Sequence, residues 1–329
     1  MATYLVTGAA GMIGSKVAEL LLRRGDEVVG VDDLCASYDV HLKEWRLAQL
    51  TPSKGFRFCR GDVAEVGAME PLFAERKSKG QAPFDGIINL AARAGVRDSL
   101  IDPWAFFRSN VTGTLNLLEL SHRHQVGKFV LASTSSLYGA HSPQPFREDA
   151  NTDVLLSPYA ASKKAAEALC STYHHLYGID VTVPRYFTVY GPAGRPDMAP
   201  FRFIKWIHDG DSLTLYGDGT QQRDFTFVED IARGTLAALK PVGFEVVNLG
   251  TERTTKLMDL IHIIESQVER KAVINREPRH PADMLATWAD TSKAKALLGW
   301  EATTPVEEGI RQAVDWYRQN HSWASKIAI

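Results

Sequence analysis

The chain has 329 residues, of which 45% are hydrophobic and 23% are charged, and its formal net charge is −2 at pH 7. This composition is that of an ordinary globular protein, and a net charge so close to zero excludes a general electrostatic attraction for nucleic acid. The sequence has no long apolar run and no signal-peptide pattern, and its three cysteines, Cys35, Cys59 and Cys170, are unclustered. We therefore expect a cytoplasmic protein with reduced thiols and no membrane partner.

Short apolar runs alternate with longer amphipathic segments through the first half of the chain. This βαβ alternation predicts an α/β fold with a doubly wound parallel sheet, the Rossmann arrangement. The predicted strands are at residues 4–6, 27–31, 56–59, 86–90, 128–133 and 180–185, and the predicted helices are at residues 12–24, 68–76, 104–124 and 158–177.

The pattern changes after Arg185, where the chain becomes rich in proline and glycine. Such a change indicates a second, smaller α/β lobe at the C-terminal end. We expect residues 1–185 to form the sheet domain, with segments near 224–250 returning to it. Residues 186–329 are expected to form mainly the substrate-binding lobe.

A glycine-rich turn follows the first predicted strand and opens the first predicted helix, with Gly8, Gly11 and Gly14 at three-residue spacing. Such glycines let the backbone approach a pyrophosphate, whose charge is stabilised by the amides and dipole of the helix N-terminus. A plain strand-to-helix turn would also carry glycines. Asp32, at the end of the second strand, favours the cofactor interpretation because its carboxylate can accept both adenosine ribose hydroxyls. Since that carboxylate would repel a 2′-phosphate, the pattern predicts NAD.

Further cofactor contacts are expected where the third and fourth strands end. Asp62 and Val63 lie just past the third strand, where the adenine is expected, although an aspartate in this place can equally cap the next helix. Leu90, Ala91 and Ala92 end the fourth strand. Small side chains there allow close passage of a cofactor, and they would also allow close packing.

A candidate reactive pair lies between Ser157 and Lys163. Ser157 suits an N-cap and Pro158 suits the first helical position, so Tyr159 is predicted in the first turn. Lys163 then lies one turn later on the same face. A phenol with an unperturbed pKa of ~10 is a weak base at neutral pH, but a nearby ammonium and a positive nicotinamide ring both favour the phenolate. Tyr159 is therefore a candidate for taking a proton from a substrate hydroxyl, whereas a surface contact is the alternative.

These segments together resemble the extended short-chain dehydrogenases/reductases, and within them the NAD-dependent nucleotide-sugar epimerases and dehydratases. The resemblance covers nearly the whole chain. Its motifs are at residues 7–14, 32, 61–62, 91–92, 110, 133–139, 159, 163, 185–187, 223–225 and 228–230.

The resemblance implies roles for individual residues. Thr134 would pair with Tyr159 on the substrate oxygen, and Lys163 would also hold the nicotinamide ribose. Arg223 would grip the UDP pyrophosphate with its guanidinium fork. The predicted catalytic residues are Tyr159, Lys163 and Thr134, and the predicted cofactor-binding residues are Gly8, Gly11, Met12, Ile13, Gly14, Asp32, Asp62, Val63, Leu90, Ala91, Ala92, Asn110, Tyr159 and Lys163.

The segment at residues 134–139 bears on which reaction follows a shared oxidation at the sugar C4. Dehydratases and UDP-glucuronate decarboxylases typically carry an acid in this segment, where this chain has Ser135 and Ser136. Without a general acid there, elimination and decarboxylation are disfavoured and epimerisation is predicted. Thr188 stands where UDP-glucose 4-epimerases usually have Asn, and the segments around it resemble UDP-glucuronate 4-epimerases.

The expected activity is thus the NAD-dependent conversion of UDP-glucuronate to UDP-galacturonate by a homodimer. A UDP-glucose 4-epimerase, a UDP-glucuronate decarboxylase and an NAD-sensing binding protein are the alternatives. We hypothesise that three hydroxyls, those of Ser135, Ser136 and Thr188, hydrogen-bond the C6 carboxylate. The predicted substrate-binding residues are Ser135, Ser136, Thr188, Arg97, Arg195, Arg223 and Asp283.

Some of these predictions carry alternatives. Arg97 and Arg195 are almost as compatible with surface or interlobe contacts. Ala282 stands where the family usually has Gly before the aspartate, which weakens the assignment of Asp283 to the nucleotide ribose. The histidine pairs at residues 122/124 and 174/175 are expected on polar helix faces without acidic companions, so no metal site is predicted.

Overall fold

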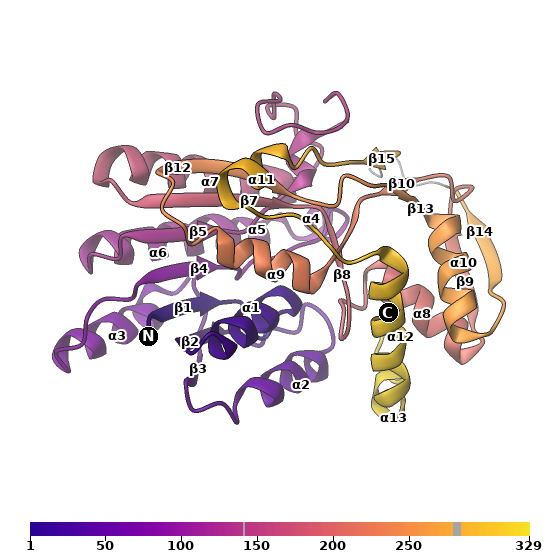
Figure 1. The fold of residues 1–329 in the computed structure, drawn as a ribbon, viewed down its shortest axis with the longest axis horizontal. Helices are drawn as coiled ribbons and strands as arrows, with labels where there is room; N and C mark the ends of the chain where they lie inside the picture. Colours follow the sequence, from indigo (N-terminus) through magenta and orange to yellow (C-terminus); the bar gives the residue numbers. More distant parts are fainter. Residues whose placement is uncertain (141, 279–283) are drawn as a thin grey trace.

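The computed structural model describes residues 1–140, 142–278 and 284–329. Its N-terminal half is a parallel sheet with helices on both faces, and a smaller lobe lies beside it (Figure 1). The strands of the main sheet are β1 (Thr3–Thr7), β2 (Glu27–Asp32), β3 (Phe56–Arg60), β4 (Gly86–Asn89), β5 (Lys128–Leu131), β6 (Ser133–Thr134), β7 (Asp180–Tyr186) and β12 (Phe244–Leu249).

The strand order across this sheet is β3-β2-β1-β4-β5-β7-β12, with β6 paired to β7, and neighbouring strands run parallel. The order reverses between β1 and β4. In a doubly wound sheet the crevice beyond the carboxyl ends of two such strands is where ligands bind. The doubly wound parallel sheet expected from the βαβ alternation is confirmed.

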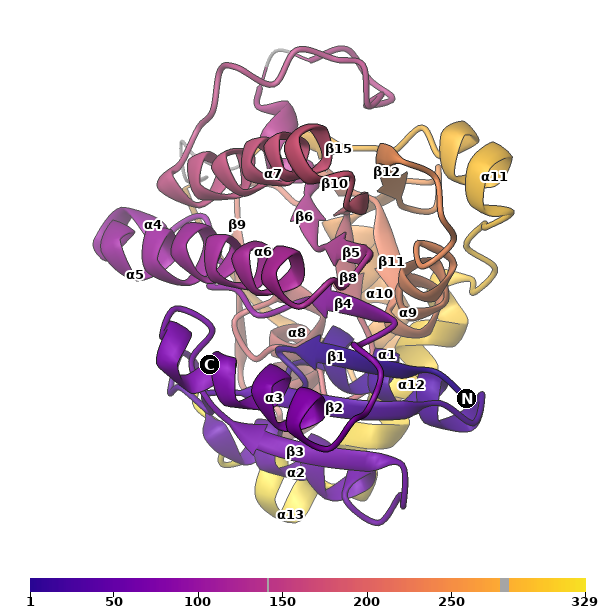
Figure 2. The ribbon, with the colours of Figure 1, turned by 90° about the vertical axis from the view of Figure 1, so that its left-hand side faces the viewer.

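Successive residues of the central strands supply the two apolar layers. Leu5 packs on one face and Val6 on the other, and Ile87 and Ile88 repeat this on the neighbouring strand. Both faces are therefore buried, as continuous apolar runs in a parallel sheet require. The helices of this part are α1 (Met12–Arg23), α2 (Val40–Leu50), α3 (Val66–Ser78), α4 (Asp98–Ile101), α5 (Pro103–Phe107), α6 (Gly113–Arg123), α7 (Pro158–Tyr177) and α9 (Val228–Ala237). Figure 2 shows α6 and α7 side by side on one face, and α1 contacts α9 in the other layer.

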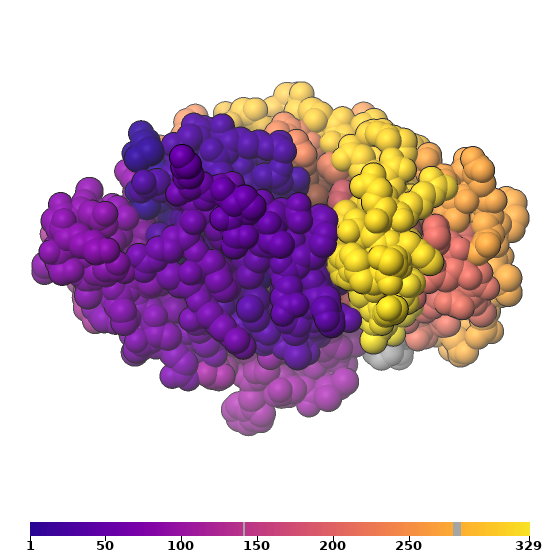
Figure 3. All heavy atoms as spheres, turned by 90° about the horizontal axis from the view of Figure 1, so that it is seen from below, coloured from indigo at the N-terminus to yellow at the C-terminus, as the bar shows by residue number. Residues whose placement is uncertain are grey.

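The core of the lobe is centred on aromatic and aliphatic side chains of its helices, and it is continuous with the sheet domain, which contributes Met12, Leu42 and Val247. The C-terminal helices lie between the N-terminal part and the rest of the lobe (Figure 3), and the rings of Trp45 and Trp316 meet across this junction with centroids 5.4 Å apart. The lobe elements are β8 (Thr188–Tyr190), α8 (Ala199–Asp209), β9 (Ser212–Tyr216), β10 (Gln222–Arg223), β11 (Phe225–Phe227), β13 (Thr255–Lys256), α10 (Leu257–Val268), β14 (Val273–Glu277), β15 (Ala286–Thr287), α11 (Ser292–Leu298), α12 (Val306–Gln319) and α13 (His321–Ala324).

The structure departs from the predicted elements in three places. The helix expected at residues 104–124 begins at Pro103 and contains a π-helical segment, Arg108–Thr112, between α5 and α6. The strand expected at 128–133 ends at Leu131, because the chain leaves the ladder at Ala132 before β6. Helix α2 was not predicted: its buried face mixes leucines with basic residues, which hides the apolar period.

We propose that the two units divide near residue 185, with segments near 224–250 belonging to the sheet domain and 186–329 forming mainly the lobe. Two observations support this division. Strand β12 pairs with β7 in the main sheet, and α9 packs against α1. Among the described residues, no helix is long and apolar enough to cross a membrane.

Candidate active site

A cavity of about 480 Å³ lies at the carboxyl ends of β1 and β4, where the strand order reverses. Its lining includes the glycine turn after β1, the end of β4, the start of α7 and, from the lobe side, Tyr186 and Arg195. A cavity of this size at this place suits a nucleotide-sized ligand.

The glycine turn leaves no room for side chains. Gly8 has a φ of 68°, and a Cβ there would lie 2.8 Å from the carbonyl oxygen of Leu90. A Cβ at Gly14 would lie 2.0 Å from the carbonyl oxygen of Gly8. The bare backbone at the N-terminus of α1 therefore faces the cavity, with Gly8, Gly11, Met12, Ile13 and Gly14 all in its lining. This arrangement fits the pyrophosphate of a dinucleotide.

Asp32 lies in the same cavity, only 6% exposed. Its Oδ2 accepts from the Ala10 amide at 3.1 Å, and its Oδ1 accepts from the Leu34 amide at 2.9 Å and from Lys43 Nζ at 3.2 Å. The Lys43 ammonium keeps a positive charge beside the buried carboxylate. Sequence reasoning missed Lys43, which is itself buried and lines the cavity. Its signal is a lysine on the face that α2 buries, where it lies with another basic residue, Arg46, among leucines.

The remaining cofactor-side predictions gather at the cavity with one exception. Asp62, Val63, Leu90, Ala91 and Ala92 all line it. Asp62 also accepts from the Ala64 amide at 2.8 Å, which turns the chain before α3, but it does not cap this helix as the alternative interpretation expected, because the N-cap is Glu65.

Asn110 is the exception, because it does not belong to the cavity lining. Its Oδ1 accepts from the Arg93 amide at 2.8 Å, and its Nδ2 donates to the Arg93 carbonyl at 3.0 Å and to Ser162 Oγ at 2.9 Å. These bonds fix the backbone of Arg93, which does line the cavity. A direct cofactor contact of Asn110 stays a prediction.

Helix α7 begins as predicted. Ser157 Oγ accepts from the Ala160 amide at 3.2 Å, and Pro158 occupies the first turn. Tyr159 and Lys163 therefore face the cavity from one side of the helix, and Lys163 Nζ donates to the Ala132 carbonyl at 2.9 Å. The Tyr159 hydroxyl is hydrogen-bonded to the side chain of Thr134. Of the three predicted catalytic residues, Tyr159 and Lys163 thus line the cavity, whereas Thr134 contacts Tyr159 without belonging to the lining.

The electrostatics of this pair differ from the expectation. Burial raises the pKa of Tyr159, and the hydrogen bond to Thr134 and the charge of Arg195 only partly oppose it. Burial also lowers the pKa of Lys163 to about 8, although the charge of Glu167 opposes this. The charges and hydrogen bonds that oppose this rise come from Thr134 and Arg195 rather than from Lys163, the residue expected to lower the Tyr159 pKa, and desolvation outweighs them.

The predicted substrate-side residues are more dispersed. Among those that the structure describes, only Arg195 lines the cavity, and it donates to the Ala94 carbonyl at 3.0 Å. Ser135 and Ser136 lie in the turn after Thr134, and Thr188 begins β8, where its amide donates to the Asp224 carbonyl at 3.0 Å. Asp283 lies outside the described residues.

The other two arginines lie apart from the cavity lining. The Arg97 guanidinium stacks over the ring of Tyr216 at 4.6 Å, which is an interlobe contact, one of the two alternatives. Arg223, in β10, donates to the Gln222 carbonyl at 2.8 Å. Their substrate contacts stay predictions.

The two histidines of the first pair, His122 and His124, make different contacts. His122 stacks on Tyr177 with centroids 3.9 Å apart. His124 Nε2 lies 2.9 Å from Glu70 Oε1, so the expectation that these histidines lack acidic companions is wrong for this residue. A single imidazole and one exposed carboxylate are still fewer ligands than a structural metal site uses.

Comparison with known proteins gives a consistent result. The model of the NAD dependent epimerase/dehydratase family matches residues 4–250. A UDP-glucuronate 4-epimerase of Thermodesulfobacterium geofontis is 52% identical over all of both chains. A UDP-glucuronic acid 4-epimerase of Bacillus cereus, solved with UDP-glucuronic acid and NAD, is 36% identical with a TM-score of 0.89, covering 97% of this chain and 99% of that one.

A third relative acts on a different sugar nucleotide. A UDP-glucose 4-epimerase of Thermotoga maritima, solved with UDP-glucose, is 30% identical with a TM-score of 0.88, and the match covers 97% of this chain and 99% of that one. The likeness therefore extends over the sheet domain and the lobe alike. Together with the glycine turn, Asp32 and the Tyr159/Lys163 pair, it shows that the chain belongs to the NAD-dependent epimerase/dehydratase family.

Proposed function

We propose that this protein converts UDP-glucuronate to UDP-galacturonate by inverting the configuration at the sugar C4. The observation that carries the proposal is that Tyr159 and Lys163 line one cavity with the glycine turn, while Thr134 contacts Tyr159 from outside that lining. The 52% identical relative, a UDP-glucuronate 4-epimerase, supports the same substrate and reaction.

The chain's own groups suit proton transfer at the C4 hydroxyl. When bound, NAD supplies a hydride acceptor and donor for C4. Burial alone keeps Tyr159 protonated, and the positive nicotinamide ring of bound NAD would favour the phenolate. As the phenolate, Tyr159 accepts the hydroxyl proton as the C4–H bond breaks, and returns it when that bond forms again on the opposite face. Thr134, hydrogen-bonded to the phenol, holds the same oxygen. The Lys163 ammonium, fixed on the Ala132 carbonyl, stabilises negative charge at this edge of the cavity.

The transient 4-keto uronate is a β-keto acid. It loses CO₂ readily when its C5–C6 bond is aligned with the carbonyl π system. Ser135, Ser136 and Thr188 are proposed to hold the carboxylate away from that alignment. Neutral hydroxyls suit this task because they orient a carboxylate without supplying a strong acid to the developing enolate. Arg195 is proposed to hold the charge of the substrate from the lobe side.

Incubation of the purified protein with UDP-glucuronate, UDP-galacturonate, UDP-glucose and UDP-xylose, with products identified by NMR, tests this function. We expect interconversion of the two uronates alone. Conversion of only the neutral sugars would identify a UDP-glucose 4-epimerase, and UDP-xylose from UDP-glucuronate would identify a decarboxylase. Retention of NAD without any conversion would favour the binding-protein alternative.

We also propose a homodimer, formed through the helical face around α5 and α7. Large apolar side chains are exposed there, including Trp104 at 83% in α5 and Leu176 at 59% in α7. Exposed apolar groups gathered on neighbouring helices are typical of a protein interface. A cytoplasmic location, supported by the free thiols Cys35, Cys59 and Cys170, stays a prediction.

A further inference from the structure

The segment between Thr134 and Tyr138 presents the proposed catalytic and carboxylate-binding hydroxyls, and it ends in a buried aromatic anchor. Residues 135–138 form a single 3₁₀ turn, whose start is held by the Ser136 amide donating to Thr134 Oγ1 at 3.1 Å. Tyr138 is 2% exposed, and its ring stacks on Phe146 with centroids 4.7 Å apart. One turn of 3₁₀ helix has few hydrogen bonds of its own. Its position therefore depends on what holds its ends.

The Tyr138 end is held by Asn248, which comes from the last strand of the sheet, β12. The Tyr138 hydroxyl donates to Asn248 Oδ1 at 2.6 Å. Burial raises the pKa of Tyr138 to about 12, so the phenol keeps this proton throughout the neutral range.

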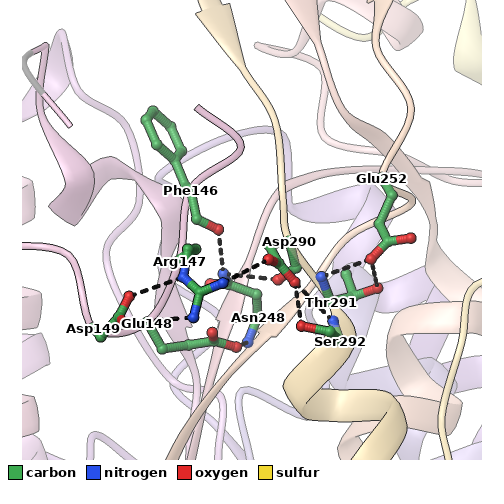
Figure 4. Close-up of polar contacts among 9 residues, drawn as sticks. All are labelled: Phe146, Arg147, Glu148, Asp149, Asn248, Glu252, Asp290, Thr291 and Ser292. Atoms are coloured by element: carbon green, nitrogen blue, oxygen red, sulfur yellow. Dashed lines mark hydrogen bonds and ion pairs between the residues drawn. The ribbon is translucent and has the colours of Figure 1, made fainter. Parts of the chain in front are cut away.

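Hydrogen bonds from both the side chain and the backbone of Asn248 hold it in place (Figure 4). It is fully buried, and its Nδ2 donates to the carbonyl oxygens of Phe146 at 2.9 Å and Asp290 at 3.1 Å. Its backbone amide donates to Glu148 Oε1 at 2.7 Å. The side-chain amide thus has one orientation that satisfies all its partners, and this orientation aims Oδ1 at Tyr138.

The other end of the segment is fixed by a buried ion pair. Ser133 Oγ donates to Glu167 Oε1 at 2.5 Å, and Glu167 accepts from Arg185 Nε at 3.0 Å and Nη2 at 2.8 Å. The Arg185 guanidinium also lies over the Tyr138 ring, 5.0 Å from its centroid. Both ends of the hydroxyl-bearing segment are therefore tied to one buried polar network.

We propose that Asn248, acting through the Tyr138 hydroxyl, is a positioning residue that fixes the turn bearing Ser135 and Ser136 and thereby keeps the keto-uronate from losing CO₂. This inference rests on the proposed function and extends it to residues outside the cavity lining. A turn that shifts by a fraction of an ångström changes how its hydroxyls hold a carboxylate, whereas the proton-transfer pair on α7 keeps its own support.

Loss of CO₂ from the 4-keto uronate proceeds in two steps. The C5–C6 bond of the 4-keto uronate breaks, CO₂ leaves, and the electron pair passes into the C4 carbonyl to give an enolate. A proton from water then adds to C5, which leaves a UDP-4-keto-pentose that is either released or reduced at C4 by the hydride stored in the first step.

Tyr138→Phe tests the proposal because it removes one hydroxyl and keeps the ring on Phe146. We expect the fraction of UDP-pentose and UDP-4-keto-pentose formed from UDP-glucuronate to rise about fivefold, the order of change that one lost hydrogen bond produces. Hydrogen exchange followed by mass spectrometry should show faster exchange of the backbone amides at residues 135–139, a readout that needs no turnover.

Tyr190→Phe is the matched control, since Tyr190 is also 2% exposed and its hydroxyl donates to the Val306 carbonyl at 3.3 Å, away from the turn. It should leave both product ratio and exchange at residues 135–139 unchanged. An unchanged product ratio together with unchanged exchange in Tyr138→Phe would overturn the proposal, as would equal changes in both variants. If the wild-type protein converts no UDP-glucuronate, the proposed function fails, while the exchange measurement still decides whether this hydroxyl positions the turn.

Discussion

The two sides of the cavity are built differently. The glycine turn, Asp32 and the residues after β3 and β4 all follow the carboxyl ends of strands in one parallel sheet, so the fold itself brings them together. The proposed substrate residues lie in the turn after Thr134, at the start of β8 and in the loop of Arg195, and of these three only Arg195 lines the cavity. Their relative positions depend on packing between the sheet domain and the lobe. A local motif therefore locates the first side, and only long-range packing locates the second.

The largest effect is expected where the two sides meet, at Tyr159. Tyr159→Phe removes the group that accepts the C4 hydroxyl proton and should lower kcat by about 10³-fold, within the range for a lost general base. NAD content measured by absorbance after denaturation should stay at the wild-type level. Tyr177→Phe, at the exposed end of the same helix, is the control and should keep full activity. Comparable losses in both variants would contradict the assigned role.

Cofactor binding should be disrupted most directly by a substitution at Gly14. Gly14→Ala puts a Cβ 2.0 Å from the Gly8 carbonyl oxygen, so the turn must open. We expect the purified variant to contain no NAD and its free energy of unfolding to fall by about 1–3 kcal/mol, the usual cost of overpacking.

Gly67→Ala provides the comparison for that variant, because a Cβ at Gly67 meets nothing within 4 Å and the residue lies in α3. It should keep its NAD and gain about 0.5–1 kcal/mol in urea unfolding, the preference of a helix for alanine. NAD retention by Gly14→Ala would show that the backbone at this turn does not hold the cofactor.

These two sides also explain what the sequence could predict. The sheet, its helices and the cofactor residues follow from periodicity and from glycines and an aspartate at strand ends, and the structure gathers them as expected apart from Asn110. Lys43 was missed because its partner, Asp32, is brought close only by the packing of α2. Asn248 carries no local signal, because its role depends on residues far away in the sequence. The positions of the dispersed substrate residues also depend on contacts with residues far away in the sequence.

The proposed role of the neutral hydroxyls on the substrate side can be tested by adding an acid to the turn. Ser136→Glu places a proton donor where decarboxylases typically carry one, and the UDP-pentose fraction formed from UDP-glucuronate should rise several-fold while NAD content stays unchanged. The matched change Ser266→Glu, at an exposed serine of α10 in the lobe, should leave product ratios alone. Product partitioning by NMR checks this, and an unaltered ratio in Ser136→Glu would count against the proposed role of the neutral hydroxyls.

The smallest effect on chemistry is expected at the helical face outside the cavity. Trp104→Glu places a charge on the exposed apolar patch of α5 and should convert a dimer into a monomer in light scattering coupled to size-exclusion chromatography. Trp288→Glu, at another partly exposed tryptophan, should leave the assembly unchanged. A wild-type protein that elutes as a monomer would contradict the proposed interface.

The central claim is that the hydrogen on C4 leaves and returns to the same carbon, with Tyr159 handling the proton of the adjoining oxygen. Incubation with UDP-glucuronate carrying deuterium at C4, in ordinary water, tests this most directly. We predict UDP-galacturonate that retains the deuterium at C4, observed by NMR and mass spectrometry. UDP-galacturonate with hydrogen from water at C4 would contradict the account.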